Sequence, residues 1–184
     1  MILNKKICGI SCDLRSVQIK DAEFILSLRL DGDLNQYLNK VDDDVSKQEE
    51  WITRQMQSDG DYYFIIESKS GESLGTISLY NINEQHAEFG RWISKGGAVQ
   101  NIESVILLHG FGFESLGLNK IYSRTAVENK KVLGFHKRFG AIVTQEITKA
   151  VPSGLKLQMA FIDKDKFEEI ERRNSLIVNE IYEN

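Results

Sequence analysis

Residues 84–141 contain the pattern that most restricts how this chain can fold. A strand-like run over 86–94 is followed by a glycine-containing loop, a helical run over 100–116, a strand-like run over 121–127, and Asn129 before a short helix. A helix N-terminus offers unpaired N–H groups and the positive end of a dipole to an anion. The order strand, glycine loop, helix, strand, helix therefore predicts a fold that can hold a phosphate-bearing cofactor.

The flanking segments complete a single domain over residues 1–184. Three strand-like runs, 62–68, 73–82 and 86–94, are joined by turns so short that they indicate an antiparallel meander. The other predicted elements are a strand over 7–16, a helix beginning at Asp21, a helix over 47–57 behind a capping box of Ser46 and Glu49, a helix over 130–139, strands over 142–148 and 155–162, and an amphipathic C-terminal helix over about 163–182.

Composition excludes several classes of function. The net charge of −4 argues against a nucleic-acid partner, because phosphate binding needs a basic face. No apolar run approaches the ~20 residues that span a bilayer, so we predict no membrane partner. The N-terminus lacks the long apolar segment of a signal peptide, which predicts a cytoplasmic protein.

The two cysteines, Cys8 and Cys12, carry no signature of a disulfide or a metal site. Four residues apart in one strand, they would share a face about 13 Å apart, which is too far for a disulfide. No CxxC pair is present, and zinc would need further ligands. We predict reduced thiols and no bound metal.

Residues 111–122, which read FGFESLGLNKIY, resemble the passage from helix to strand in the GNAT superfamily of acyl-CoA N-acetyltransferases. Glu103 resembles a glutamate common in ribosomal-protein-type members, and Gln48 with Trp51 resembles a pair found in ribosomal-protein and amino-sugar members. The resemblance covers nearly the whole chain. It implies an α/β (α+β) fold of three layers, with a mixed, mostly antiparallel central sheet flanked by helices, and acetyl-CoA as co-substrate.

The resemblance also assigns cofactor contacts to this chain. The acetyl carbonyl and the pantetheine amide would pair with the backbone of Arg91, Trp92 and Ile93. The pyrophosphate would be held by the amides of Gly97, Ala98, Val99, Gln100 and Asn101. Val99 and Asn101 stand where the family has small residues, and a Cβ at Val99 obstructs some approaches of the backbone to a phosphate. Amides at a helix N-terminus can still bind the anion.

Three side chains are candidates for the chemistry. Glu88 resembles a glutamate of the fourth strand that takes a proton from the amine, and strand alternation puts it on one face with Trp92, opposite Arg91. Asn129 resembles an asparagine that contacts CoA, and it is also a favoured helix N-cap. His136 stands where many members carry a tyrosine that protonates the departing thiolate, which an imidazolium could do. A solvated glutamate and a surface histidine are the alternatives.

The resemblance implies an N-acetyltransferase in which a primary amine of a small molecule, such as an amino sugar, attacks acetyl-CoA directly. Its acceptor surface is expected in residues 31–46 and in the loop 149–155. Within the first segment, Asp42, Asp43 and Asp44 would attract an amine or form a solvated loop. A protein N-terminal acetyltransferase, a non-catalytic acyl-CoA-binding module and an interaction protein remain alternatives, as do a monomer and a homodimer.

Overall fold

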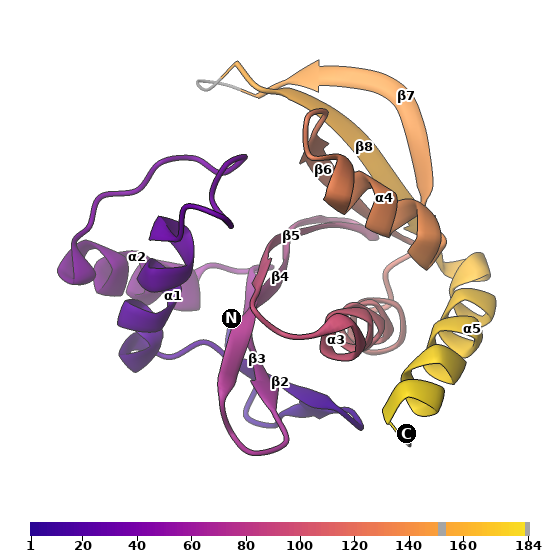
Figure 1. Ribbon diagram of the computed structural model, residues 1–184, viewed down its shortest axis with the longest axis horizontal. Coiled ribbons are helices and arrows are strands. Elements are labelled where there is room, and N and C mark those ends of the chain that lie inside the picture. Colours follow the sequence, from indigo (N-terminus) through magenta and orange to yellow (C-terminus); the bar gives the residue numbers. More distant parts are fainter. Residues whose placement is uncertain (151–153, 183–184) are drawn as a thin grey trace.

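The computed structural model describes residues 1–150 and 154–182 (Figure 1). Most predicted elements are present within a few residues of their expected bounds. In chain order the elements are β1 (Ile7–Cys8), β2 (Cys12–Ser16), a 3-10 turn (Ile19–Asp21), α1 (Ala22–Leu30), α2 (Val45–Gln57), β3 (Tyr62–Ser68), β4 (Ser73–Asn83), β5 (His86–Ser94), α3 (Ala98–Gly110), a π-helical turn (Phe111–Ser115), β6 (Lys120–Ala126), α4 (Lys130–Phe139), β7 (Ile142–Lys149), β8 (Lys156–Asp163) and α5 (Lys164–Tyr182).

The strands of the described residues form one sheet in the order β1-β2-β3-β4-β5-β6-β8-β7. β3, β4 and β5 make the predicted antiparallel meander. β5 and β6 run parallel, and their register pairs extend only from His86 opposite Lys120 to Glu88 opposite Tyr122. Beyond Glu88 the two strands part, and this fork determines where a ligand can enter the sheet.

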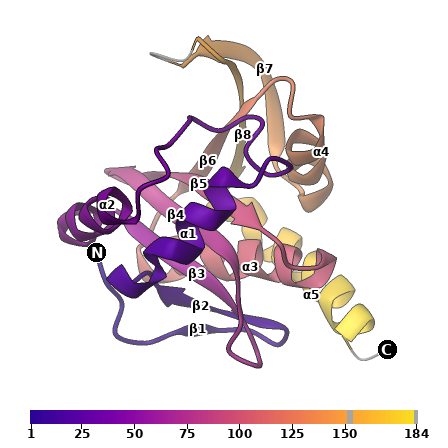
Figure 2. The same ribbon diagram turned by 60° about the vertical axis from the view of Figure 1, so that its left-hand side comes forward.

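Helices cover both faces of the sheet, as predicted. α1 and α2 lie on one side, while α3 and α5 pack together on the other (Figures 1 and 2). α4 lies beside β6, β7 and β8 in both views. In the described part of the chain, no helix combines the length and the apolar character needed to cross a membrane.

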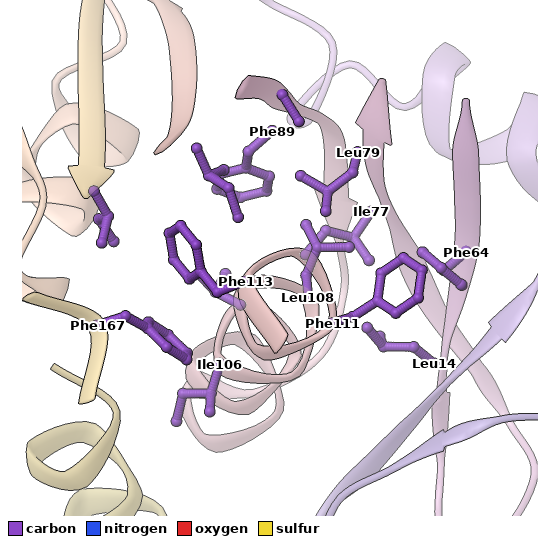
Figure 3. Packing of buried hydrophobic residues seen from close by; sticks show 14 of the residues in the cluster. Leu14, Phe64, Ile77, Leu79, Phe89, Ile106, Leu108, Phe111, Phe113 and Phe167 are labelled. Carbon is purple, nitrogen blue, oxygen red and sulfur yellow. The ribbon is translucent and has the colours of Figure 1, made fainter. Parts of the chain in front are cut away.

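The main apolar core fills the space between the sheet and α3 (Figure 3). α3 and the π-helical turn contribute several of its largest side chains, and the Phe113 ring lies 5.0 Å from that of Phe167 on α5. The facing side chains of the sheet are Leu14, Phe64, Ile77, Leu79 and Phe89. A smaller cluster lies under α1 and α2. The sheet is therefore buried on both faces near its centre.

The predicted strand over 7–16 is instead a hairpin. β1 and β2 pair antiparallel, with Cys8 opposite Asp13. Consequently Cys8 is exposed and Cys12 is buried, and the prediction that they share one face of a strand was wrong. Both are free thiols.

Helix ends also differ in detail from the predictions. Asp44, rather than Ser46, caps α2, and its Oδ1 accepts a hydrogen bond from the Lys47 N–H at 3.2 Å. Asp21 precedes α1 as predicted, but its side chain makes no capping bond. The helix predicted over 100–116 is divided into α3 and the π-helical turn.

A buried carboxylate attaches the N-terminal hairpin to α3. The Glu103 side chain accepts hydrogen bonds from the backbone N–H groups of Ile10 at 2.6 Å, Ser11 at 2.7 Å and Cys12 at 2.9 Å, and from the Ser11 hydroxyl at 2.5 Å. Gly9 lies so close that a Cβ there would come within 2.6 Å of this carboxylate. Glu103 thereby fixes α3 against the sheet edge.

We expect Glu103→Ala to lower the free energy of unfolding by about 3 kcal/mol or more, because it leaves buried N–H groups without acceptors. Urea denaturation measures this change. Glu169→Ala, an exposed glutamate of α5, is the control and should change stability by no more than about 0.5 kcal/mol. Equal, small effects of the two substitutions would contradict the structural role of Glu103.

Candidate active site at the fork between β5 and β6

A cavity of about 520 Å³ opens where β5 and β6 separate, a size typical of small-molecule sites. Its walls come from the segments 33–38, 89–94, 123–126 and 128–132, together with Asn101 and His136. Because β5 and β6 are parallel, the helices that follow them, α3 and α4, both begin at this edge of the sheet. No group of three or more His, Cys, Asp or Glu side chains within 1–150 and 154–182 could hold a metal ion.

A β-bulge in β5 redirects the side chains at the fork. Arg91 and Trp92 together stand between two register pairs where β4 has only Ile77, and Arg91 has a φ of +48°. The alternation predicted for this strand is therefore wrong here. Arg91 lies with Glu88 on the side of α1 and α2, and Trp92 turns the other way, with its ring centroid 4.6 Å from that of Phe135 on α4.

The predicted cofactor-contacting backbone of β5 is firmly held. The Arg91 guanidinium donates to both carboxylate oxygens of Asp61, at 2.6 and 2.8 Å, and lies 4.3 Å above the Tyr80 ring. The Thr76 hydroxyl donates to the Arg91 carbonyl at 2.7 Å. Arg91, Trp92 and Ile93 all line the cavity, so this stretch is in place to meet a ligand.

The predicted pyrophosphate loop forms the start of α3. Gly97 is its N-cap, and Ala98 is exposed in its first turn. The Val99 side chain packs against the core, so it does not obstruct the helix end. Asn101 lines the cavity, and its Nδ2 donates to the Gly96 carbonyl at 3.0 Å. The cavity lining includes Asn101 but not Gly97, Ala98, Val99 or Gln100.

The start of α4 forms a second wall. Asn129 is the N-cap, and its Oδ1 accepts a hydrogen bond from the Val132 N–H at 3.2 Å. Asn129, Lys130 and Lys131 line the cavity. A helix N-terminus beside two ammonium groups favours an anion.

His136 is buried, contrary to the alternative of a surface histidine. It lines the cavity, and its Nε2 lies 3.2 Å from the Ser123 hydroxyl oxygen. Burial lowers the pKa of His136 from 6.5 to about 4. The imidazole is therefore neutral at pH 7, which opposes the predicted role of an imidazolium as proton donor.

Glu88 is also buried, but it does not line the cavity. Its carboxylate accepts hydrogen bonds from Arg124 Nε at 3.0 Å, Arg124 Nη2 at 2.7 Å, the Tyr80 hydroxyl at 3.0 Å and Asn81 Nδ2 at 3.0 Å. Four donors occupy both oxygens. The arrangement does not support the predicted role of Glu88 as a free base in contact with the amine.

The segment 31–46 meets the cavity only through its first half, from Asp33 to Leu38. Asp42 pairs with Lys47, and Asp44 caps α2, so these acids serve local structure. Trp51 packs edge-on against Tyr63, with the two ring centroids 5.7 Å apart. Of the predicted acceptor loop 149–155, residues 151–153 lie outside the described residues.

Sequence reasoning missed Ser123, Arg124 and the two lysines that open α4. Alternation along β6 puts Ser123 and Arg124 on opposite faces of the strand, so the sequence pattern gives no sign that both belong to one site. The missing information was the parallel pairing with β5, which brings both faces of β6 to the fork.

Comparisons with known proteins agree with this geometry. The family model described as an acetyltransferase (GNAT) domain matches residues 13–142. No curated protein sequence matches the chain. Among solved structures, apo FdhC, a nucleotide-linked sugar GNAT, is 28% identical with a TM-score of 0.80, covering 94% of this chain and 98% of its own.

Two further structures share the fold at lower identity. Spermidine N-acetyltransferase from Vibrio cholerae, solved with CoA and spermine, is 21% identical with a TM-score of 0.76, covering 85% of this chain and 98% of its own. A GCN5-related N-acetyltransferase from Brucella melitensis is 16% identical with a TM-score of 0.82, covering 96% of this chain and 86% of its own. The matched family model and the forked sheet together show that this chain belongs to the GNAT family of acetyltransferases.

Proposed function

We propose that this protein transfers the acetyl group of acetyl-CoA to a primary amine of a small molecule, with an amino sugar as the favoured class of acceptor. The observation that carries the proposal is the cavity at the fork, with two helix N-termini at the same sheet edge. Those helix ends suit the phosphates of CoA, and the bulged stretch at Arg91 suits the acyl-pantetheine arm.

The two faces of β6 separate the cofactor from the acceptor. Ser123 points toward His136 on α4, whereas the next residue, Arg124, points toward Glu88 and the side of α1 and α2. Acetyl-CoA would then lie on the α3 and α4 side, and the amine would enter from the segment 33–38. The acetyl carbon would lie in the fork between them.

The charges around the cavity favour a sugar over a polyamine. Two carboxylates, Asp33 and Glu128, line it, against the cations of Arg91, Arg124, Lys130 and Lys131. A polycation would need an excess of carboxylates, because its charges must be matched on binding. The 28% identity to a nucleotide-linked sugar GNAT supports the same class.

In direct attack, the amine nitrogen forms a bond to the acetyl carbon, the carbon–sulfur bond breaks, and one proton leaves the nitrogen while the thiolate gains one. The buried pair of Ser123 and neutral His136 stands at the cavity wall to pass a proton. Glu88 acts indirectly, because its oxygens are already bonded to Arg124, Tyr80 and Asn81.

We expect release of CoA thiol when the protein is mixed with acetyl-CoA and a nucleoside-diphosphate-linked amino sugar, measured with a thiol reagent. Spermidine and a peptide with a free N-terminus are the comparison acceptors. Turnover of the peptide alone would favour a protein N-terminal acetyltransferase. Tight binding of acetyl-CoA without turnover of any amine would favour a non-catalytic acyl-CoA-binding module.

We expect Ala98→Glu to weaken acetyl-CoA binding about tenfold, because a carboxylate at the start of α3 repels the pyrophosphate. Isothermal titration measures the Kd. The same carboxylate favours the helix dipole, so thermal stability should not fall. Ala98→Gln is the uncharged control, and equal affinities for the two variants would contradict a phosphate site at this helix end.

Stability should depend on pH through His136, whose folded pKa of about 4 lies below its unfolded value of 6.5. Between these values the unfolded chain binds more protons, so the free energy of unfolding falls as pH falls. From pH 7.5 to pH 5 we expect a loss of about 2 kcal/mol from this residue. Urea denaturation of His136→Gln should show that loss removed, whereas His86→Gln, at an exposed site, should retain it.

A further inference from the structure

Arg124 has an arrangement that neither the sequence nor the proposed reaction explains. It stands two residues past the last register pair between β5 and β6, lines the cavity, and has a 43% exposed side chain. Its Nε and Nη2 are bonded to Glu88. Within 1–150 and 154–182, no protein acceptor pairs with its Nη1. The edge of the guanidinium formed by Nε and Nη2 is therefore fixed by Glu88. The edge that carries Nη1 faces no protein acceptor among these residues and is called the free edge below.

The surroundings of Glu88 hold the Arg124 guanidinium in one orientation. The Tyr80 hydroxyl and Asn81 Nδ2 donate to the same carboxylate, each at 3.0 Å. These two neutral donors fix the position of the carboxylate, and the carboxylate in turn holds the guanidinium through Nε and Nη2. The contacts also fix its plane in advance, which lowers the entropy cost of binding a ligand.

The other cations at the cavity do not compete for this role. Arg91 is bonded through two nitrogens to both oxygens of Asp61 and is covered by the Tyr80 ring. Lys130 and Lys131 belong to the start of α4, on the side assigned to the cofactor. Arg124 is therefore the cavity cation with donors available to an acceptor molecule.

We propose that the free edge of Arg124 binds an oxyanion carried by the amine acceptor, a phosphate or a carboxylate, and that Glu88 is its positioning residue. This inference rests on the proposed function of the same site. A guanidinium matches both oxyanions through parallel N–H bonds. The acceptor class is then an amine that carries its own negative group, such as a nucleoside-diphosphate-linked amino sugar.

The test compares acceptors that differ only in the anion. The double variant Glu88→Gln/Arg124→Gln removes the site without leaving a buried unpaired carboxylate. Arg124→Lys keeps the positive charge but loses the planar guanidinium with its parallel N–H donors. Arg172→Gln, an exposed arginine of α5, is the charge-matched control. Each is assayed with the linked amino sugar, the same free amino sugar, and an α-amino acid, after thermal unfolding has confirmed folding.

We expect the double variant to raise the KM for the linked sugar at least tenfold, with the KM for acetyl-CoA and for the free sugar unchanged. Arg124→Lys should restore part of this loss. A rise in KM for the α-amino acid alone would support the anion site, with a carboxylate rather than a phosphate as its ligand. An equal rise for charged and free acceptors, or a rise in the KM for acetyl-CoA, would overturn the proposal.

Glu88→Gln alone distinguishes positioning from simple support of the fold. It keeps the guanidinium charge but loosens its plane, so the KM for the linked sugar should rise severalfold, with a smaller change in the KM for the free amino sugar. A fall in kcat with an unchanged KM would overturn the positioning role.

A binding measurement separates failure of this inference from failure of the proposed function. Titration of uridine diphosphate onto protein saturated with CoA needs no turnover. If no amine is acetylated but the double variant still binds this probe tenfold more weakly than the native chain, the anion site stands and the transferase proposal fails. Equal binding by both would overturn the anion site.

Discussion

The separation of β5 from β6 after Glu88 is the constraint on which the rest of this structure depends. Parallel strands that stay paired leave no room for a ligand within the sheet, and here the pairing ends after three register pairs. The bulge at Arg91 increases the local twist of β5. The bonds that Arg91 donates to Asp61 and accepts from the Thr76 hydroxyl hold it in that shape. The same fork brings both faces of β6 to one cavity, which places Ser123 and Arg124 within a single site.

Much of the fold could be predicted from sequence because its elements have strong local signals. The meander of β3 to β5 follows from β-rich runs with short turns, and α4 follows from its Asn129 cap and closing glycine. The hairpin of β1 and β2 was missed because its turn, near Gly9, is stabilised by a residue far along the chain, Glu103. No local pattern records such a contact.

The site was harder to predict than the fold because the roles of its side chains depend on their neighbours. The sequence pointed to Glu88 and His136 as a candidate base and acid. It did not show that Arg124 would pair with the Glu88 carboxylate or that burial would keep the His136 imidazole neutral. The face of Arg91 was predicted wrongly because one additional residue in a strand reverses every later side chain. These are consequences of tertiary packing, which periodicity does not encode.

The Glu103 contact has a consequence for the order in which the molecule assembles. It joins residues separated by 91 to 93 positions, so the chain must close a long loop before this contact contributes any stability. Until then the N-terminal hairpin lacks its main acceptor, and α3 lacks its attachment to that edge of the sheet. The helix end assigned to phosphate binding would therefore reach its final position late in folding, although α3 itself can form early.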